Sequence, residues 1–268
     1  MKATGRSIGQ EVSFVNGQLL ITPLTSDRSR QVDLVVPSMA MVEACRADEF
    51  TFFQPFIDAG TLTVGQMRHA ARRYHLGKTR SGRPIFWMID AMCSPLDAHI
   101  TPDTWMSTLL KAREPLLRYW HVQHCLFGEH LLSHTDVKSV SSMQSVVEKQ
   151  SVSSVKSVVE DLSICVVESE QSAVVLSALF PESLWMAYVS PSHLCDGLFA
   201  PLQGRRVTIF PRTDPSSTTY LFFADLAASL RHCLDIRITV SSILEDYASD
   251  SQKERCIDLV DLLLEDSP

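Results

Sequence analysis

The segment from Ile164 to Asp214 constrains the fold of this chain more than any other part of its 268 residues. It contains three short, almost wholly apolar runs, and a stretch of helical character at about residues 171–180 separates the first two. The three runs are residues 164–167, 184–189 and 206–210. Continuous apolar strands that alternate with helices are typical of a parallel sheet covered on both faces. The sequence therefore predicts an α/β fold.

Acidic residues follow two of these strands. Glu168 comes directly after the first strand, and Asp214 follows the third strand within the segment Pro211-Arg212-Thr213-Asp214. Ligands of open α/β sheets bind in the crevice outside the carboxyl ends of the strands. We therefore expect Glu168 and Asp214 to lie close together in such a crevice.

The same strand ends resemble those of a known family. Val-Glu-Ser-Glu at residues 167–170, followed by Phe-Pro-x-x-Asp at residues 210–214, resembles the Toprim fold of primases, topoisomerases and related nucleases. Further phrases in the same order resemble the primase-like Toprim proteins of bacterial mobile genetic elements. These phrases are residues 73–78, 85–90, 125–132, 201–206 and 257–263. The resemblance covers roughly Pro37 to Asp266 with one insertion. It implies a Toprim-like (Rossmann-like) parallel sheet flanked by helices and preceded by a smaller α+β N-terminal region.

The resemblance also implies a metal site. In Toprim enzymes a glutamate after the first strand acts as a general acid or base. An Asp-x-Asp pair after the later strand holds Mg²⁺, which prefers hard oxygen ligands. Matched by position, Glu168 takes the place of the catalytic glutamate and Asp214 that of the second aspartate, with Glu170 as a further metal ligand. If the site is active, the expected chemistry is Mg²⁺-dependent nucleotidyl or phosphoryl transfer.

Arg212 departs from this pattern, because it stands where the first aspartate of the pair should be. A guanidinium group is always charged and does not ligate a cation, so it would repel Mg²⁺ and pair with Glu168 or Glu170 instead. Asp214 also has a structural explanation, since Asp214-Pro215 is a favourable helix start. The sequence predicts a degenerate site, and a purely structural acidic cluster remains an open alternative.

One concentrated basic region stands out in a chain whose net charge is −7. Between Ala59 and Ile89 there is no acidic residue, and six cationic residues fall inside: Arg68, Arg72, Arg73, Lys78, Arg80 and Arg83. A predicted helix, opened by a capping box of Thr63 and Gln66, would place the first two on one stripe. We expect this helix and the basic hairpin after it to contact nucleic-acid phosphates. The alternative is an ordinary solvated helix face.

The chain divides into three predicted parts. They are an N-terminal arm at residues 1–36, a primase-like α+β region at residues 37–120 and the Toprim-like α/β domain at residues 121–268. Asn16-Gly17 predicts a hairpin in the arm. A duplicated Ser/Val-rich sequence at about residues 135–162 predicts a surface insertion with no core of its own.

Four further helices are predicted from apolar spacing, caps and prolines. They are residues 37–56, ended by Pro55; residues 101–119, kinked or broken by Pro115; residues 215–233, capped by Asp214; and residues 251–264, opened by a capping box of Ser251 and Glu254. A strand at residues 236–240, in which apolar residues alternate with Arg237 and Thr239, is expected near a sheet edge.

Cysteine and histidine usage argues against a zinc module. The seven cysteines are scattered and include no Cys-x-x-Cys pair. A histidine-rich span surrounds Cys125, but its spacing fits no closed zinc site, so no zinc is expected. Its histidines are His121, His124, His130 and His134. No apolar run is long enough for a membrane span and no signal peptide is visible, so we expect a cytoplasmic protein without a membrane partner.

Three hypotheses for function follow. The first is a primase-related DNA-binding protein of a mobile element's replication system with a degenerate site, which binds single-stranded DNA or a primer–template. The second is an active Mg²⁺-dependent primase or nuclease in which Arg212 holds a phosphate or nucleotide. The third is a protein-interaction module that binds replication proteins of the element. The first hypothesis fits Arg212 and the lack of a zinc module best.

Overall fold

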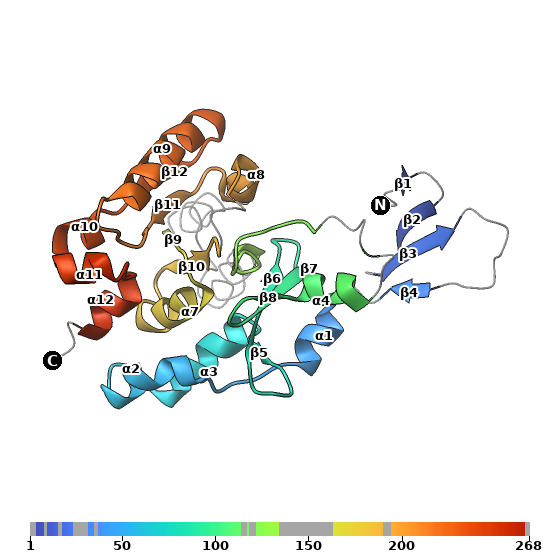
Figure 1. Ribbon diagram of the computed structural model, residues 1–268, viewed down its shortest axis with the longest axis horizontal. Helices are drawn as coiled ribbons and strands as arrows, with labels where there is room; N and C mark the ends of the chain where they lie inside the picture. Colours follow the sequence, from blue (N-terminus) through green and yellow to red (C-terminus); the bar gives the residue numbers. More distant parts are fainter. Residues whose placement is uncertain are drawn as a thin grey trace, which may run out of the picture.

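The computed structural model describes residues 4–7, 10–15, 18–23, 32–34, 37–113, 117, 122–133, 163–189 and 194–265. The predicted insertion at residues 135–162 lies outside these ranges, as do His121 and His134. The described part of the chain forms three four-stranded sheets, one after another along the sequence (Figure 1). The fold is α/β as predicted, with antiparallel sheets first and a parallel sheet flanked by helices after them.

The first sheet is an antiparallel meander. Its strands are β1 (Thr4–Ser7), β2 (Gln10–Val15), β3 (Gln18–Pro23) and β4 (Val32–Leu34), paired in that order. Val15 pairs with Gln18, which is the register of a hairpin with a two-residue loop. The hairpin predicted in the arm is therefore confirmed in its strands, while Asn16-Gly17 lies outside the described residues.

The second region combines short helices with an antiparallel sheet. Its helical elements are α1 (Met39–Ala44), η1 (Thr51–Phe53), α2 (Gln54–Asp58), α3 (Val64–Arg73) and α4 (Met106–Arg113). Its strands are β5 (Gly77–Lys78), β6 (Pro84–Ile89), β7 (Pro95–Ile100) and β8 (Thr104–Trp105). The capping box of Thr63 and Gln66 is present at the start of α3. The predicted basic hairpin is confirmed as the antiparallel pair β5–β6.

Two helix predictions in this region are wrong. Pro55 does not end a helix over residues 37–56 but lies in the first turn of α2, where its missing N–H costs nothing. The helix expected over residues 101–119 begins only at Met106, because Thr104 and Trp105 pair with β7 instead.

The third sheet is parallel and has the order β10-β9-β11-β12. Its strands are β9 (Ile164–Val167), β10 (Leu184–Ala187), β11 (Arg206–Ile209) and β12 (Arg237–Val240). The chain runs from β9 to β10 on one side and then crosses to β11 on the other side of β9. The strand order therefore reverses at the boundary between β9 and β11, and this boundary is where ligands of such sheets bind. The prediction that β12 lies at a sheet edge is confirmed.

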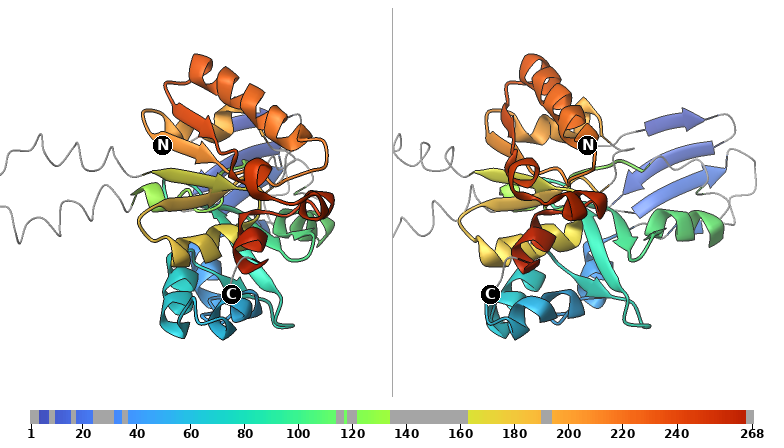
Figure 2. Two further views of the ribbon diagram at one scale, coloured as in Figure 1. Left: turned by 90° about the vertical axis from the view of Figure 1, so that its left-hand side faces the viewer. Right: turned by 60° about the vertical axis from the view of Figure 1, so that its left-hand side comes forward.

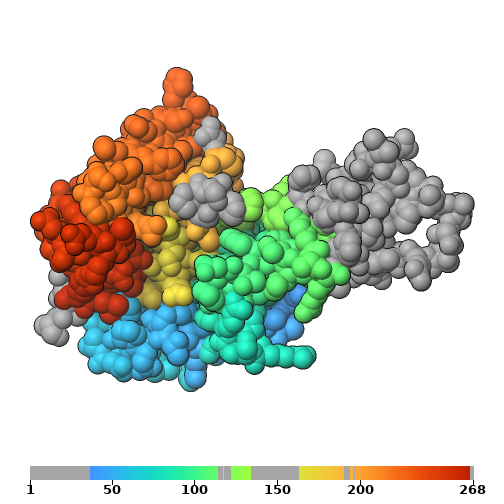
Figure 3. Space-filling model, in the orientation of Figure 1, coloured from blue at the N-terminus to red at the C-terminus, as the bar shows by residue number. Residues whose placement is uncertain are grey.

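Helices cover both faces of this sheet (Figure 2). They are α7 (Glu170–Leu179), α8 (Asp196–Phe199), η4 (Ala200–Leu202), α9 (Thr218–Cys233), α10 (Ile243–Tyr247), α11 (Asp250–Glu254) and α12 (Leu259–Glu265). Helix α7 packs between the sheet and α3 of the second region, and α9 packs on β12. In the space-filling view the second region, blue to green, and the parallel-sheet region, yellow to red, lie directly against each other (Figure 3).

The last predicted helix, residues 251–264, is instead two helices. The capping box is formed by Ser249 and Gln252 rather than by Ser251 and Glu254, and α11 ends after Glu254. Cys256 has a positive φ of 52°, a backbone conformation that cannot continue a helix. Asp258 then starts α12, because its Oδ1 accepts the N–H groups of Val260 and Asp261.

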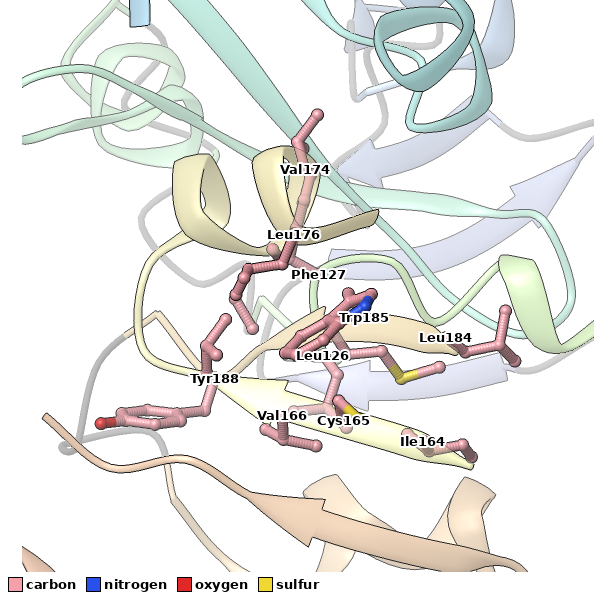
Figure 4. Close-up of a cluster of buried hydrophobic side chains, with 14 of the residues drawn as sticks. Leu126, Phe127, Ile164, Cys165, Val166, Val174, Leu176, Leu184, Trp185 and Tyr188 are labelled. Carbon is pink, nitrogen blue, oxygen red and sulfur yellow. The ribbon is translucent and has the colours of Figure 1, made fainter. Parts of the chain in front are cut away.

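One hydrophobic core joins the second region to the parallel-sheet region. It contains buried side chains of residues 50–88 together with side chains of residues 125–132 and 164–262. Figure 4 shows Leu126 and Phe127 among Val174 and Leu176 of α7 and Trp185 of β10. The predicted α+β region and the predicted α/β domain thus share one core.

Two contacts anchor this junction. Phe127 and Ala187 exchange both backbone hydrogen bonds, at 2.9 and 3.1 Å, which adds one antiparallel partner to the outer side of β10. The buried Tyr74 hydroxyl donates to the carbonyl oxygen of Trp185 at 2.6 Å. Phe127 and Tyr74 therefore connect the rest of the chain to the edge of the parallel sheet at β10.

Candidate functional site at the carboxyl ends of β9 and β11

The candidate site lies at the strand-order reversal between β9 and β11. Glu168 and Ser169 follow β9, and the Ser169 hydroxyl caps α7 by accepting the N–H of Ser172 at 3.4 Å. The segment Pro211 to Asp214 follows strand β11, which pairs directly with β9. The two acidic segments singled out in the sequence thus follow neighbouring strand ends.

Arg212 forms an ion pair with Glu168. Its Nε lies 3.0 Å from Oε2 of Glu168, and the two side chains are 48% and 19% exposed. The pairing predicted for Arg212 is therefore confirmed, with Glu168 as the partner. The guanidinium lies on the carboxylate that the resemblance assigns to catalysis, and one of the two oxygens of this carboxylate is engaged.

Glu170 is directed to a different partner. Its side chain is only 6% exposed, and its Oε1 lies 2.6 Å from Nδ1 of His99 in β7. Burial of His99 disfavours its charged form, but the hydrogen bond and negative charge of Glu170 outweigh burial and raise the pKa of the imidazole. Glu170 therefore links α7 to the second region, and the structure does not bring it to Arg212.

Asp214 stabilises the start of α9. Its Oδ1 accepts the N–H groups of Ser216 and Thr218, each at 3.0 Å, and its Oδ2 accepts that of Thr219 at 2.7 Å. Burial opposes ionisation, but these backbone donors outweigh it and hold the pKa of Asp214 well below its usual range. The prediction that Asp214 is itself the N-cap of a helix from Pro215 is wrong in detail. The helix begins at Thr218, after Ser217 in a left-handed conformation, and the Asp214 carboxylate reaches its first turn from outside.

Tyr188 borders the same crevice and was missed in the sequence. It follows β10, its ring packs against Phe223 of α9, and its hydroxyl is buried near Glu168. Burial raises the pKa of this phenol, and the negative charge of Glu168 raises it further. Val189 next to it has a φ of 64°, which is strained for a β-branched residue. In the sequence, only the position of Tyr188 at the carboxyl end of a predicted strand could have indicated that it borders the crevice.

Asp258 is, after Tyr188, a second residue that the sequence analysis did not single out. It accepts a hydrogen bond from the Ser172 hydroxyl of α7, and burial raises the pKa of its carboxyl group. Since its other oxygen caps α12, its position follows from tertiary packing, and no local pattern could have revealed it.

The residues at this crevice do not fit a Mg²⁺ site of the Toprim kind. Such a site needs several carboxylates with free oxygens around one ion. Glu168 instead holds a guanidinium, Glu170 an imidazole, and Asp214 three backbone N–H groups. Across residues 37–113, 122–133, 163–189 and 194–265, no three His, Cys, Asp or Glu side chains come together as a candidate metal site.

Arg68 and Arg72, which were predicted to share one face of α3, both form ion pairs. Arg68 Nη2 lies 2.5 Å from Oε1 of Glu49, and Arg72 places Nε and Nη2 at 2.9 and 2.5 Å from Oδ2 of Asp48. Both arginine side chains stay about half exposed, at 48% and 58%. The carboxylates come from the loop before η1, outside the stretch that is free of acidic residues.

The other four residues predicted to contact nucleic acid differ in their surroundings. Arg83 donates to the backbone oxygens of Ile100 and Thr101 and to the Thr104 hydroxyl, so its guanidinium holds the sheet together. Arg80 is exposed at the turn between β5 and β6, whereas Arg73 is half-buried. Lys78 extends over the Phe50 ring, with its ammonium 5.0 Å from the centroid.

The histidines near Cys125 do not converge in the described part of the chain. His124 is exposed, whereas the buried His130 has its Nε2 3.1 Å from the backbone oxygen of Arg73. Buried Glu129 instead organises this segment, since its two carboxylate oxygens accept the N–H groups of Ala91 and Leu126.

Comparison with known proteins gives one match. Residues 153–213 match the family described as Domain of unknown function (DUF6371). The described part of that segment, residues 163–189 and 194–213, contains β9 to β11 together with Glu168 and Arg212. No curated protein matches the chain, and no solved structure does. Among the helices that the structure describes, none has the length and apolar character needed to cross a membrane.

Proposed function

We propose that this chain is a Toprim-like, primase-related protein that binds single-stranded DNA or a primer–template. It would act in the DNA replication or processing system of a mobile genetic element, and its acidic crevice would not support Mg²⁺ catalysis. The observation that carries the proposal is the ion pair of Arg212 with Glu168 at the strand-order reversal. The parallel pairing of β9 with β11, which sets their carboxyl ends side by side, supports the Toprim-like part.

The Arg212 guanidinium makes metal binding at Glu168 unfavourable. A divalent and a monovalent cation about 4 Å apart repel each other by roughly 8 kcal/mol at an effective dielectric constant of about 20. Solvent screening reduces this figure, because Arg212 is about half exposed. Mg²⁺ would therefore have to displace Arg212 from Glu168, and Asp214 would have to give up its contacts to α9.

The basic surface of the second region supports the DNA-binding part. Arg80 at the tip of the β5–β6 hairpin and the exposed faces of Arg68 and Arg72 lie on consecutive elements of the chain. Phosphate contacts of this kind supply sequence-independent affinity that falls as salt is raised. Such contacts are compatible with an acidic protein, because the positive charge is concentrated in one place.

The direct test restores the missing aspartate. In calorimetric titrations with Mg²⁺ or Mn²⁺, we expect no site-specific binding to the native protein at millimolar metal. Arg212→Asp removes the repelling charge and recreates an Asp-x-Asp pair, so we expect it to bind the metal. Glu168→Ala in the Arg212→Asp background should abolish that binding, and Arg113→Asp, an equal charge change at an exposed site on α4, should not create it.

DNA binding is tested by fluorescence anisotropy with a labelled single-stranded oligonucleotide, on the native protein, Arg212→Asp and one further variant. Native protein and Arg212→Asp should bind equally, whereas Lys78→Glu with Arg80→Glu should bind more weakly and with a flatter salt dependence. Metal binding to the native protein that Glu168→Ala and Asp214→Ala both abolish would contradict the degenerate site. Failure of the native protein to bind any oligonucleotide would contradict the DNA-binding part.

A further inference from the structure

The loop before η1, helix α3 and strand β5 border a wide-open surface hollow of about 540 Å³. Four cationic side chains and two carboxylates line it: Arg46, Arg68, Arg72, Lys78, Asp48 and Glu49. Its size falls within the range of small-molecule sites, which is roughly 300–1,000 Å³. Positive charge predominates in the lining, so the hollow favours an anionic ligand.

The two carboxylates already occupy the positions of such a ligand. Asp48 accepts two hydrogen bonds from Arg72 through one oxygen, and Glu49 accepts one from Arg68. The hydrogen bond from Arg72 lowers the pKa of Asp48. A guanidinium with its N–H donors aligned in this way is suited equally well to a phosphate.

These internal ion pairs are weak enough to be exchanged. All four side chains are substantially exposed, and ion pairs at exposed positions contribute little to stability because solvent screens them. A phosphate monoester carries a charge of about −1.5 to −2 near neutral pH and offers three acceptor oxygens. It therefore competes well with two separate carboxylates for the same two guanidinium groups.

Lys78 supplies a charge that the carboxylates do not neutralise. It forms no ion pair with any residue in the described part of the chain, and its ammonium lies 5.0 Å from the centroid of the Phe50 ring. The Phe50 side chain is buried and therefore fixed in place, and it holds the lysine at the hollow. Arg46 also lines the hollow, although its guanidinium pairs with Glu43 at 2.9 Å.

We propose that this hollow binds a phosphate monoester, as found at the end of a nucleic-acid strand, and that Asp48 and Glu49 occupy its place on Arg72 and Arg68 when no ligand is bound. The nucleic-acid source of the phosphate rests on the proposed function. A terminal phosphate fits better than an internal one because it carries more charge and has a nucleotide on one side only. The acidic pair thereby excludes weaker anions from the hollow.

The experiment compares oligonucleotides of one sequence that carry a 5′-phosphate, a 3′-phosphate or hydroxyl groups at both ends. With native protein, we expect one of the phosphorylated strands to bind about tenfold more tightly than the hydroxyl strand in fluorescence anisotropy. Arg72→Gln should remove that difference, whereas Arg113→Gln, a matched change on α4, should keep it. Asp48→Asn with Glu49→Gln should raise the affinity for the phosphorylated strand several-fold. Circular dichroism checks that each variant is folded.

A second measurement separates this inference from the proposed function. Inorganic phosphate is titrated to about 10 mM while the arginine Nε–H signals are followed by ¹⁵N NMR, with chloride as the control. Shifts of Arg68 and Arg72 with phosphate alone would support the hollow even if no oligonucleotide binds. Oligonucleotide binding that ignores terminal phosphates, or arginine signals that do not respond to phosphate, would overturn the inference while leaving DNA binding elsewhere on the protein intact.

Discussion

Asp214 shows how a single side chain can serve the fold where the resemblance places a metal ligand. Its two oxygens accept three backbone N–H groups at the start of α9, and they thereby satisfy donors that no intrahelical acceptor reaches. The charge of the carboxylate also favours its place at the positive end of the helix. Metal binding and helix stabilisation would therefore compete for the same oxygens.

Replacing Asp214 should cost stability in a pH-dependent way. Asp214→Ala is expected to lower the free energy of unfolding by about 1–2 kcal/mol at pH 7, the usual cost of losing a helix cap. The pKa of Asp214 is depressed in the folded protein, so its contribution is fully present above the unfolded value of about 3.9 and is lost as the pH falls further. Urea denaturation of both proteins at pH 7 and at about pH 3 measures the difference. Asp235→Ala, at an exposed position before β12, is the control, and a gap between native and Asp214→Ala that widens in acid would contradict the assignment.

For single residues, the sequence predicted those contacts that follow from opposite charges at the ends of neighbouring strands. Opposite charges at positions 168 and 212 follow strands that pair directly, so their contact could be anticipated. The partner of Glu170 could not, because His99 belongs to another sheet and no local pattern connects the two. The Asp48 and Glu49 pairs with α3 were missed for the same reason, since the acidic loop precedes the basic stretch by about twenty residues.

At the scale of elements, the approach of the segment around Phe127 to β10 depends on Gly128. Its φ of 87° is a conformation that residues with a side chain rarely adopt. A Cβ built there would lie 3.0 Å from both the carbonyl oxygen of Trp185 and Cε1 of Tyr74. Both neighbours are fixed, one as sheet backbone and the other as a buried ring.

Gly128→Ala should therefore destabilise the protein by more than backbone strain alone. Gly82 provides a matched control, because its φ is 84° and a Cβ there would meet nothing within 4 Å. We expect Gly82→Ala to cost about 1 kcal/mol, and Gly128→Ala to cost about 2–3 kcal/mol more through steric conflict. Thermal denaturation of the two variants measures both values. Equal losses would show that the segment moves aside without cost.

Elements with a strong periodic signal were predictable, and their ends were less so. The strands of the parallel sheet and the capping box of α3 are determined by local residues and appear as expected. The start of α9 and the division between α11 and α12 depend on single residues in left-handed conformations, Ser217 and Cys256. Neither is a glycine or an asparagine, so neither carried the usual signal for such a conformation.

Over the whole molecule, the continuous core couples the second region to the parallel sheet. Helix α3 packs on α7, and Tyr74 donates a buried hydrogen bond to the backbone of β10. Burial raises the pKa of Tyr74 to about 12, so this donor remains protonated at physiological pH. Each region covers apolar surface of the other, and neither would keep its core dry alone.

We therefore expect residues 37–265 to unfold in one cooperative transition. Tyr74→Phe should lower the free energy of unfolding by about 1–2 kcal/mol, because the carbonyl of Trp185 loses its hydroxyl donor. Tryptophan fluorescence and far-UV circular dichroism should give coincident urea transitions for the native protein and for Tyr74→Phe. Two separate transitions, with only one shifted by the substitution, would instead indicate two independent folding units.

The hydrogen bonds between Phe127 and Ala187 have a further consequence for how copies of this protein can meet. An uncovered edge strand is a template on which another chain can add a strand and start aggregation. At β10 part of this template is already taken by the chain itself. The opposite edge, β12, is only four residues long and begins with the exposed Arg237, and both features disfavour strand addition. Both edges of the parallel sheet therefore disfavour the addition of a strand from another chain.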